Sequence, residues 1–330
     1  MILNAYRSDH PGSLLTLPLI VALLWTAAIF EGSPPPPYDG MPLYEILGGF
    51  FRAYPWIGWL TGALLALIGS LFCIGIARDL EFPEDHGNLP PLLYPLLVGL
   101  FPSAQWAHPT AFANLFLMLA FWRLMKVQKG GDPTSHLFDA GFSLGVAAMF
   151  HLPFLLFFPF LWIAAFILRA IGWRDLLWPL IGLMIPFLFL SVYYYWIGSL
   201  GALPRLFWFK GVEKLLFTEN RYLLSLSLWG MLGIFTLSGL ILSFRELQNS
   251  NMQGKKLRWI FFLFIPFTFA CAVLGAEHFA DPFAWGVLAF PLSYLLTRCF
   301  NRKGWNSIYS IAFYLWLFLL IANDHLSSYF

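Results

Sequence analysis

The chain consists of one long apolar stretch after another, with charged residues confined mainly to the short segments between them. An ordinary soluble domain is about 25% charged, whereas only 11% of these 330 residues are Asp, Glu, Lys or Arg. A helix needs roughly 20 apolar residues to cross a membrane, and the chain offers about 11 such stretches, some short or re-entrant. We therefore expect an all-α integral membrane protein, one polytopic domain over residues 1–330, with amphipathic surface helices in two outer loops.

The predicted spans in the middle of the chain are short for a full crossing, and we interpret them as two tight hairpins, 89–125 and 138–168. Each hairpin tip, Gln105–Pro109 and His151–Pro153, contains a histidine and a proline. Irregular backbone within a membrane is tolerated only where it is buried in protein or lines a wet cavity. The predicted spans are 14–30, 56–77, 89–103, 109–125, 138–150, 154–168, 176–197, 223–243, 259–276, 283–297 and 305–323.

Lys and Arg are distributed unevenly between alternate loops. With the N-terminus inside, all but five of the 19 Lys and Arg residues lie on the inner side. Because cytoplasmic loops are enriched in these residues, we expect a multi-pass membrane protein with a cytoplasmic N-terminus and a C-terminus on the outer side. The inner loops 78–88 and 245–258 carry no phosphate-binding glycine pattern, and we interpret them as solvated connectors.

Residues 31–55, between the first two predicted spans, are the first place in the chain where polar side chains gather. Glu31 and Asp39 flank four consecutive prolines, which no helix interior tolerates. Residues 42–54 then predict a helix that lies on the membrane surface, because its apolar residues share one face. The opposite face carries Glu45 and Arg52, for which there are two interpretations: they belong to a site, or they pair with each other. The apolar face comprises Leu43, Ile46, Leu47, Phe50 and Tyr54.

Other ionisable residues also collect at the outer ends of the predicted spans. Such groups are costly at membrane depth, so a role at a water-filled cavity is their default interpretation. For His108 and His151, capping of the hairpin tips is an equal alternative, and the segment 277–281 could instead be a capping turn before Pro282. The candidate cavity-lining residues are Glu45, His108, His151, Glu277, His278 and Asp281.

No metal or other cofactor is expected. Carboxylates and histidines could hold a divalent cation, but their spacing matches no metal motif. The three cysteines lack CxxC or CxxH spacing, so the sequence indicates neither a zinc site nor a disulfide framework.

The second long outer loop, residues 198–222, holds most of the outward cations. They suit the headgroup of an anionic lipid or a lipid-linked phosphate; the alternative is that they are anchors that snorkel to the headgroup layer. The outward cations are Arg52, Arg205, Lys210, Lys214 and Arg221.

The order of these parts resembles the C-type glycosyltransferases, multi-span enzymes that take sugar from polyprenyl-phosphate carriers. Residues 14–200 are similar to their core, in particular LPPLLYPLLVGLFPSAQWAHPTAFANLFLMLAFWRLMK and FDAGFSLGVAAMFHLPFLLFFPFLWIAAFILR; residues 201–330 would add an outer helix and C-terminal spans. More narrowly, MPLYEIL, LPPLLY, HPTAFANLFL, FDAGFSLGVAAMF and WRDLLWPLIGLMIPFLF look like a polytopic inner-membrane family of the Bacteroidota whose activity is not established.

The resemblance implies transfer from a lipid-linked sugar at the outer face of the inner membrane. Glu31 or Asp39 would act as general base, and the outward cations would hold the leaving lipid phosphate. Unlike that superfamily, the chain has Gly-Ser-Pro after Glu31 in place of a second acid, and no large outer domain.

Two rival functions remain open. The first is a non-catalytic subunit that scaffolds an envelope secretion, motility or assembly complex. The second is a lipid flippase or transporter. It ranks last, because few charges lie away from the span ends to bind an ion or polar solute near the bilayer midplane. The expected partners are membrane lipids, a polyprenyl-phosphate sugar or other envelope membrane proteins, and not nucleic acid.

Overall fold

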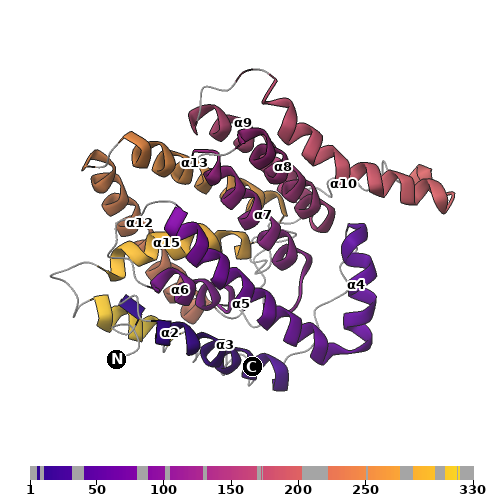
Figure 1. The fold of residues 1–330 in the computed structure, drawn as a ribbon. Coiled ribbons are helices and arrows are strands. Elements are labelled where there is room, and N and C mark those ends of the chain that lie inside the picture. The colour runs from indigo at the N-terminus through magenta and orange to yellow at the C-terminus, as the bar shows by residue number, and fades with distance from the viewer. Residues whose placement is uncertain are drawn as a thin grey trace.

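A computed structural model describes most of the chain, and every regular element in the described part is a helix (Figure 1). The described residues are 6–7, 11–31, 41–79, 88–100, 105–128, 132–168, 172, 174–202, 222–249, 252–275, 285–301, 309–317 and 319; among these, the side chains of residues 11, 27–31, 202, 222–229, 246–249 and 253 are not described.

The helices follow the predicted spans closely. The elements are α2 (Pro11–Leu15), α3 (Leu17–Glu31), α4 (Pro42–Ala53), α5 (Pro55–Asp79), α6 (Leu89–Val98), α7 (Pro109–Lys126), α8 (Pro133–Phe150), η3 (Leu152–Leu156), α9 (Phe157–Leu168), α10 (Leu177–Trp196), η4 (Leu200–Ala202), α12 (Tyr222–Asn249), α13 (Met252–Gly275), η5 (Gly286–Leu288) and α15 (Ala289–Phe300). Residues 309–317 are also helical.

Three of these helices are long and apolar enough to cross a membrane: α5, α10 and the part of α13 from Gly254 onward. Several others are apolar but shorter. The expectation of an α-helical membrane protein is thus confirmed at this level, whereas the number of crossings stays a prediction.

The predicted hairpin 89–125 does not form a closely packed pair of helices. Instead, α6 packs mainly against α5 and α15, and α7 packs mainly against α8 and α5. A Cβ on Gly69 of α5 would overlap the ring of Tyr94, so this glycine lets α6 lie directly on α5. The second hairpin is closer to expectation, because α8 contacts both η3 and α9.

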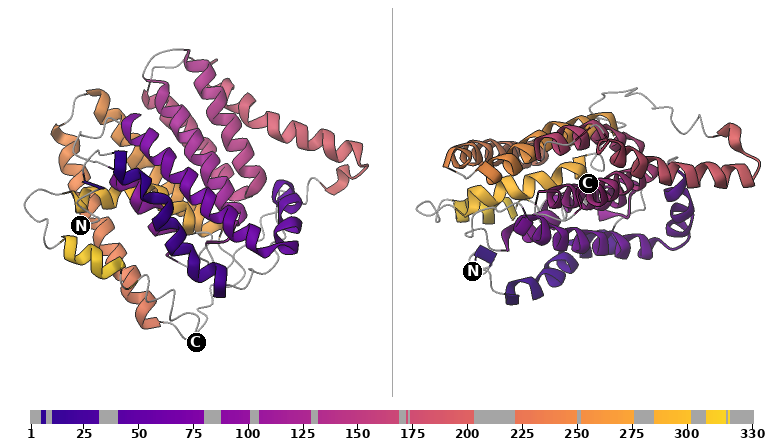
Figure 2. Two further views of the ribbon diagram at one scale, coloured as in Figure 1. Left: turned by 60° about the horizontal axis from the view of Figure 1, so that its bottom comes forward. Right: turned by 45° about the horizontal axis from the view of Figure 1, so that its top comes forward.

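Helices α8 and α10 approach each other through glycines. A Cβ on Gly141 of α8 would overlap the backbone carbonyl of Pro179 in α10, and a Cβ on Gly182 of α10 would overlap the carbonyl of Phe138. Small residues at such positions let helix backbones come close, as is common between membrane helices. Beyond this contact, α10 projects past the end of α8 (Figures 1 and 2), and Trp196 at its end is 87% exposed.

One end of the bundle, which we call the charged end, gathers most of the described charges. The Arg7 guanidinium donates to the carbonyl oxygen of Phe300, the last residue of α15 (2.6 and 2.9 Å). The indole of Trp122 near the end of α7 donates to the carboxylate of Asp79, the last residue of α5. Residues at the N-terminus, in the middle and near the C-terminus of the chain therefore meet at this end.

The expected connector 245–258 is largely helical, which corrects the sequence interpretation. Helix α12 continues to Asn249 and α13 begins at Met252, so both extend past their apolar stretches. Arg, Glu, Leu, Gln and Lys are good helix formers, and this explains why the charged sequence prolongs the helices.

Candidate functional site at the histidine end

The opposite end, which we call the histidine end, is built around α4. This helix lies across the direction of α5, α7 and α8 (Figures 1 and 2). Tyr44, Gly48 and Phe51 are buried against the protein, whereas Ile46 and Phe50 are 69% and 50% exposed. The predicted helix is present. Of its predicted apolar residues, Leu43 and Leu47 pack against the core, whereas Ile46, Phe50 and Tyr54 are exposed. An exposed apolar side of this kind is typical of a helix at a membrane interface.

Glu45 and Arg52 do not pair with each other, so that alternative is wrong. The Arg52 Nε donates to the carbonyl oxygen of Gly48 (3.2 Å) within the same helix. Glu45 is exposed and interacts electrostatically with Tyr194, near the end of α10. The root of the second outer loop, which follows α10, therefore lies close to α4.

The connection before α7, residues 105–108, is buried in the protein. Gln105 and Ala107 are fully buried, and a Cβ on Gly62 of α5 would overlap the carbonyl oxygen of Gln105. The same oxygen accepts a hydrogen bond from Trp25 Nε1 of α3 (2.9 Å). Glu31, the last residue of α3, lies six residues beyond Trp25, which is about 9 Å further along the helix axis.

His108 caps α7, as one of its two interpretations predicted. Its Nδ1 accepts from the backbone N–H of Thr110 (3.4 Å) and lies 2.9 Å from the Thr110 hydroxyl. With Nδ1 as acceptor, a neutral ring carries its proton on Nε2. On its other side, the His108 ring lies 6.3 Å from the ring of Tyr44, between centroids. This histidine thus connects the surface helix α4 to the start of α7.

His151 lies in the connection between α8 and η3 and makes no side-chain cap. Its ring contacts Phe154 edge-on at 5.8 Å between centroids. A Cβ on Gly275, the last residue of α13, would lie only 2.6 Å from His151 Nε2. The segment that leads to Glu277, His278 and Asp281 therefore starts directly beside this histidine.

Burial sets the charge of both histidines. Burial lowers the pKa of His108 well below its usual value, and the nearby His151 lowers it further. Burial likewise lowers the pKa of His151 to about 4. Both imidazoles are therefore neutral at physiological pH, which suits hydrogen bonding to a hydroxyl group rather than to a phosphate.

A small cavity of about 30 Å³, lined mostly by apolar groups, lies between α5, α6 and α7. This volume holds about two water molecules, since one needs roughly 10–15 Å³. Asn114 Nδ2 donates across it to the Tyr94 hydroxyl (3.3 Å) and to the carbonyl oxygen of Gly286 (3.4 Å), while Asn114 Oδ1 has no hydrogen-bond partner in the described part of the chain. Thr110, the partner of His108, also lines the cavity.

The sequence interpretation missed Tyr94, Thr110 and Asn114. A lone amide within the apolar stretch HPTAFANLFL was the available signal, because a polar group inside a membrane helix needs a partner. Tyr94 and Thr110 are less telling, since either is common in apolar helices.

The structure places several of the predicted site residues, or the helix ends next to them, at the histidine end. Helix α4, His108, His151 and the end of α13 meet at the histidine end. For Glu31 only the backbone is described, as the last residue of α3. The remaining predicted site residues lie outside the described residues: Asp39, Arg205, Lys210, Lys214, Arg221, Glu277, His278 and Asp281.

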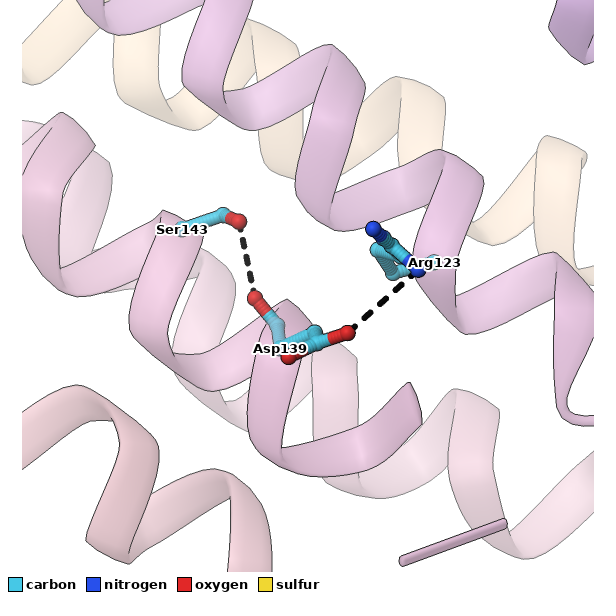
Figure 3. Close-up of polar contacts among 3 residues, drawn as sticks. All are labelled: Arg123, Asp139 and Ser143. Carbon is cyan, nitrogen blue, oxygen red and sulfur yellow. Dashed lines mark hydrogen bonds and ion pairs between the residues drawn. The ribbon is translucent and has the colours of Figure 1, made fainter. Parts of the chain in front are cut away.

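An ion pair within the bundle is separate from this site. Arg123 of α7 and Asp139 of α8 face each other, with Arg123 Nη1 3.4 Å from Asp139 Oδ2 (Figure 3). The Ser143 hydroxyl donates to the backbone carbonyl of Asp139 (2.7 Å). Both charged side chains are a little over one-third exposed, and such pairs contribute little to stability in water. We interpret the pair as an alignment contact between α7 and α8.

Among the described residues, no three His, Cys, Asp or Glu side chains come close enough to hold a metal ion. All three cysteines are buried and free. No protein-family model, no curated protein and no solved structure matches this chain. Its function is therefore argued below from the sequence and from the geometry of the histidine end.

Proposed function

We propose that this protein is a membrane glycosyltransferase that acts on a lipid-linked sugar at the outer face of the inner membrane. One observation supports this proposal most strongly: α4, His108, His151 and the end of α13 meet at one end of the bundle. Sites distant in the sequence would then face one reaction space. The exposed apolar side of α4 supplies a surface along which a polyprenyl chain can lie.

In this mechanism the first outer loop provides the base and the second loop the phosphate-binding cations. Glu31 or Asp39 takes the proton from an acceptor hydroxyl. The acceptor oxygen attacks the anomeric carbon, the bond between sugar and phosphate breaks, and the lipid phosphate leaves. Arg205, Lys210 or Arg221 stabilises its charge. The neutral His108 and His151 orient sugar or acceptor hydroxyls rather than binding the phosphate.

The test measures free polyprenyl phosphate, the leaving group that is released whichever acceptor takes the sugar. Bacterial membranes that contain the overproduced full-length protein receive a polyprenyl-phosphate hexose with a labelled lipid. We expect the double variant Glu31→Gln/Asp39→Asn to release polyprenyl phosphate roughly 100-fold more slowly, since general bases contribute about that much or more. At least one of the single variants should show the same loss.

Asp175→Asn is the matched control, because it neutralises a carboxylate in the connection before α10, outside the histidine end, and the asparagine oxygen can still accept from the backbone N–H of Gly172. Its rate should stay within about twofold of the natural protein. Full activity of both single variants and of the double variant would exclude the proposed base. If the natural protein releases no polyprenyl phosphate and instead purifies with a stoichiometric membrane protein, the scaffold function replaces the enzyme.

A further inference from the structure

Asn114 lies within the apolar helix α7, and its side chain is almost entirely buried, at 3% exposed. Its Nδ2 group donates to the Tyr94 hydroxyl of α6 and to the carbonyl oxygen of Gly286 in η5. Its Oδ1 atom accepts no hydrogen bond in the described part of the chain. An unpaired buried acceptor is costly, and buried polar groups usually find a partner in the protein or in ordered water. Oδ1 therefore needs a donor that the described residues do not supply.

The cavity of about 30 Å³ between α5, α6 and α7 collects the polar groups around this atom. Asn114, Tyr94, Thr110 and Gly286 all line it. The Tyr94 hydroxyl accepts from Asn114, so its own proton remains to be donated, and no described residue accepts it. The Thr110 hydroxyl lies 2.9 Å from His108 Nδ1 and donates to that nitrogen when it is the acceptor. The Thr110 oxygen can then still accept, so the cavity presents one donor and two acceptors.

Water matches this set of groups, because one molecule both donates and accepts hydrogen bonds. A cavity lined only by apolar groups stays dry, whereas a buried water typically makes about three hydrogen bonds. Three polar groups, Asn114 Oδ1, the Thr110 oxygen and the Tyr94 hydroxyl, are at hand, and the volume corresponds to about two water molecules. A metal cation would use the two acceptors and leave the Tyr94 proton without a partner.

We propose that this cavity is a hydration site that binds about two ordered water molecules. Together they donate to Asn114 Oδ1 and to the Thr110 oxygen, and they accept from the Tyr94 hydroxyl. A chain of hydrogen bonds then runs from His108 through Thr110 and the waters to α6 and α7. It keeps the Thr110 hydroxyl directed at His108 Nδ1, and thereby the imidazole proton on Nε2. The site does not depend on whether the protein transfers sugar.

Hydroxyl radicals, generated by X-ray irradiation of the purified full-length protein in detergent, oxidise side chains that contact bound water. Tyr94 is 3% exposed and should be oxidised severalfold faster than Tyr6, which is 1% exposed and bonds to Thr16 instead. Mass spectrometry of the peptides measures both rates. Ala66→Val adds two methyl groups at the cavity wall and should slow oxidation of Tyr94 to the rate of Tyr6. Ala63→Val, which adds the same groups to α5 outside the cavity lining, should leave that rate unchanged.

If Ala66→Val does not fold, Asn114→Leu tests the same point, because it removes the polar groups that hold the water and should leave the cavity dry. Oxidation of Tyr94 as slow as that of Tyr6 in the natural protein would overturn the proposal, and so would undiminished oxidation of Tyr94 in either folded variant. The thermal midpoint of unfolding should be the same in sodium chloride and in choline chloride. A higher midpoint in sodium chloride that Asn114→Leu abolishes would assign the cavity to a cation instead of water.

Discussion

At the scale of single residues, His151 shows how burial sets the charge of a histidine at a helix end. The folded protein binds a proton on His151 only near pH 4, whereas an unfolded chain binds it near pH 6.5. Protonation therefore favours the unfolded state as the pH falls from about 6.5 toward 4. His108 shifts in the same direction and adds to the effect.

We therefore expect the protein to lose stability in detergent when the pH is lowered from 7 to 5, by about 2 kcal/mol for His151 alone. His151→Gln should reduce this loss, because glutamine does not titrate. Thermal unfolding at several pH values measures it. An identical pH dependence in the natural protein and in His151→Gln would contradict this account.

The candidate residues were only partly predictable from the sequence. His108 and His151 stood out because ionisable groups at the ends of apolar stretches are costly, and the structure places both in one buried region. Nothing in the local sequence indicated that Gly275 would lie against His151 or that Tyr94 would reach Asn114. These contacts depend on how distant helices pack, which spacing along the chain does not encode.

At the scale of helices, the contact between α8 and α10 depends on glycines that have no room for a side chain. We expect Gly141→Ala to destabilise the protein by roughly 1–3 kcal/mol, because its Cβ would overlap the Pro179 carbonyl and force the helices apart. Gly233→Ala in α12 is the matched control, since no atom lies within 4 Å of its Cβ position. This control should be neutral or slightly stabilising, because alanine favours helix more than glycine does.

Thermal or denaturant unfolding of both variants in detergent tests this expectation. Equal stability of Gly141→Ala and Gly233→Ala would contradict the close packing of α8 on α10.

Helix α4 illustrates the complementary case: its bounds and its apolar side were predictable from periodicity. The side of α4 that packs on the bundle, with Tyr44 and Phe51, was not predictable. In the sequence these two aromatic residues cannot be told from other apolar residues of the helix.

At the scale of the whole molecule, charge separates the two ends of the bundle. The histidine end carries Glu45 and Arg52, and the charged end carries Lys256 among many others. We expect a cysteine in place of Glu45 to react with a membrane-impermeant maleimide in intact spheroplasts. A cysteine in place of Lys256 should react only after permeabilisation, because cytoplasmic segments are enriched in Lys and Arg.

The natural cysteines provide a low background for this labelling, because Cys73, Cys271 and Cys299 are all buried. The reverse pattern, with Lys256→Cys labelled from outside, would invert the predicted orientation. It would also move the proposed glycosyltransferase site to the cytoplasmic face, where the lipid-linked donors of these enzymes are not expected.

The sequence by itself determined the class of the protein and the positions of its helices. Apolar length and the spacing of prolines and charges are local properties, and the described part of each predicted span lies in a helical stretch. Only the tertiary structure decided which helices touch: α7 on α8 rather than α6, Arg258 beside Arg298, and His108 near His151. These choices arise from close packing, where a single Cβ at Gly62 or Gly141 would exclude the observed neighbour. An apolar pattern shows that a helix face must be covered, but the shapes of all the helices together determine what covers it.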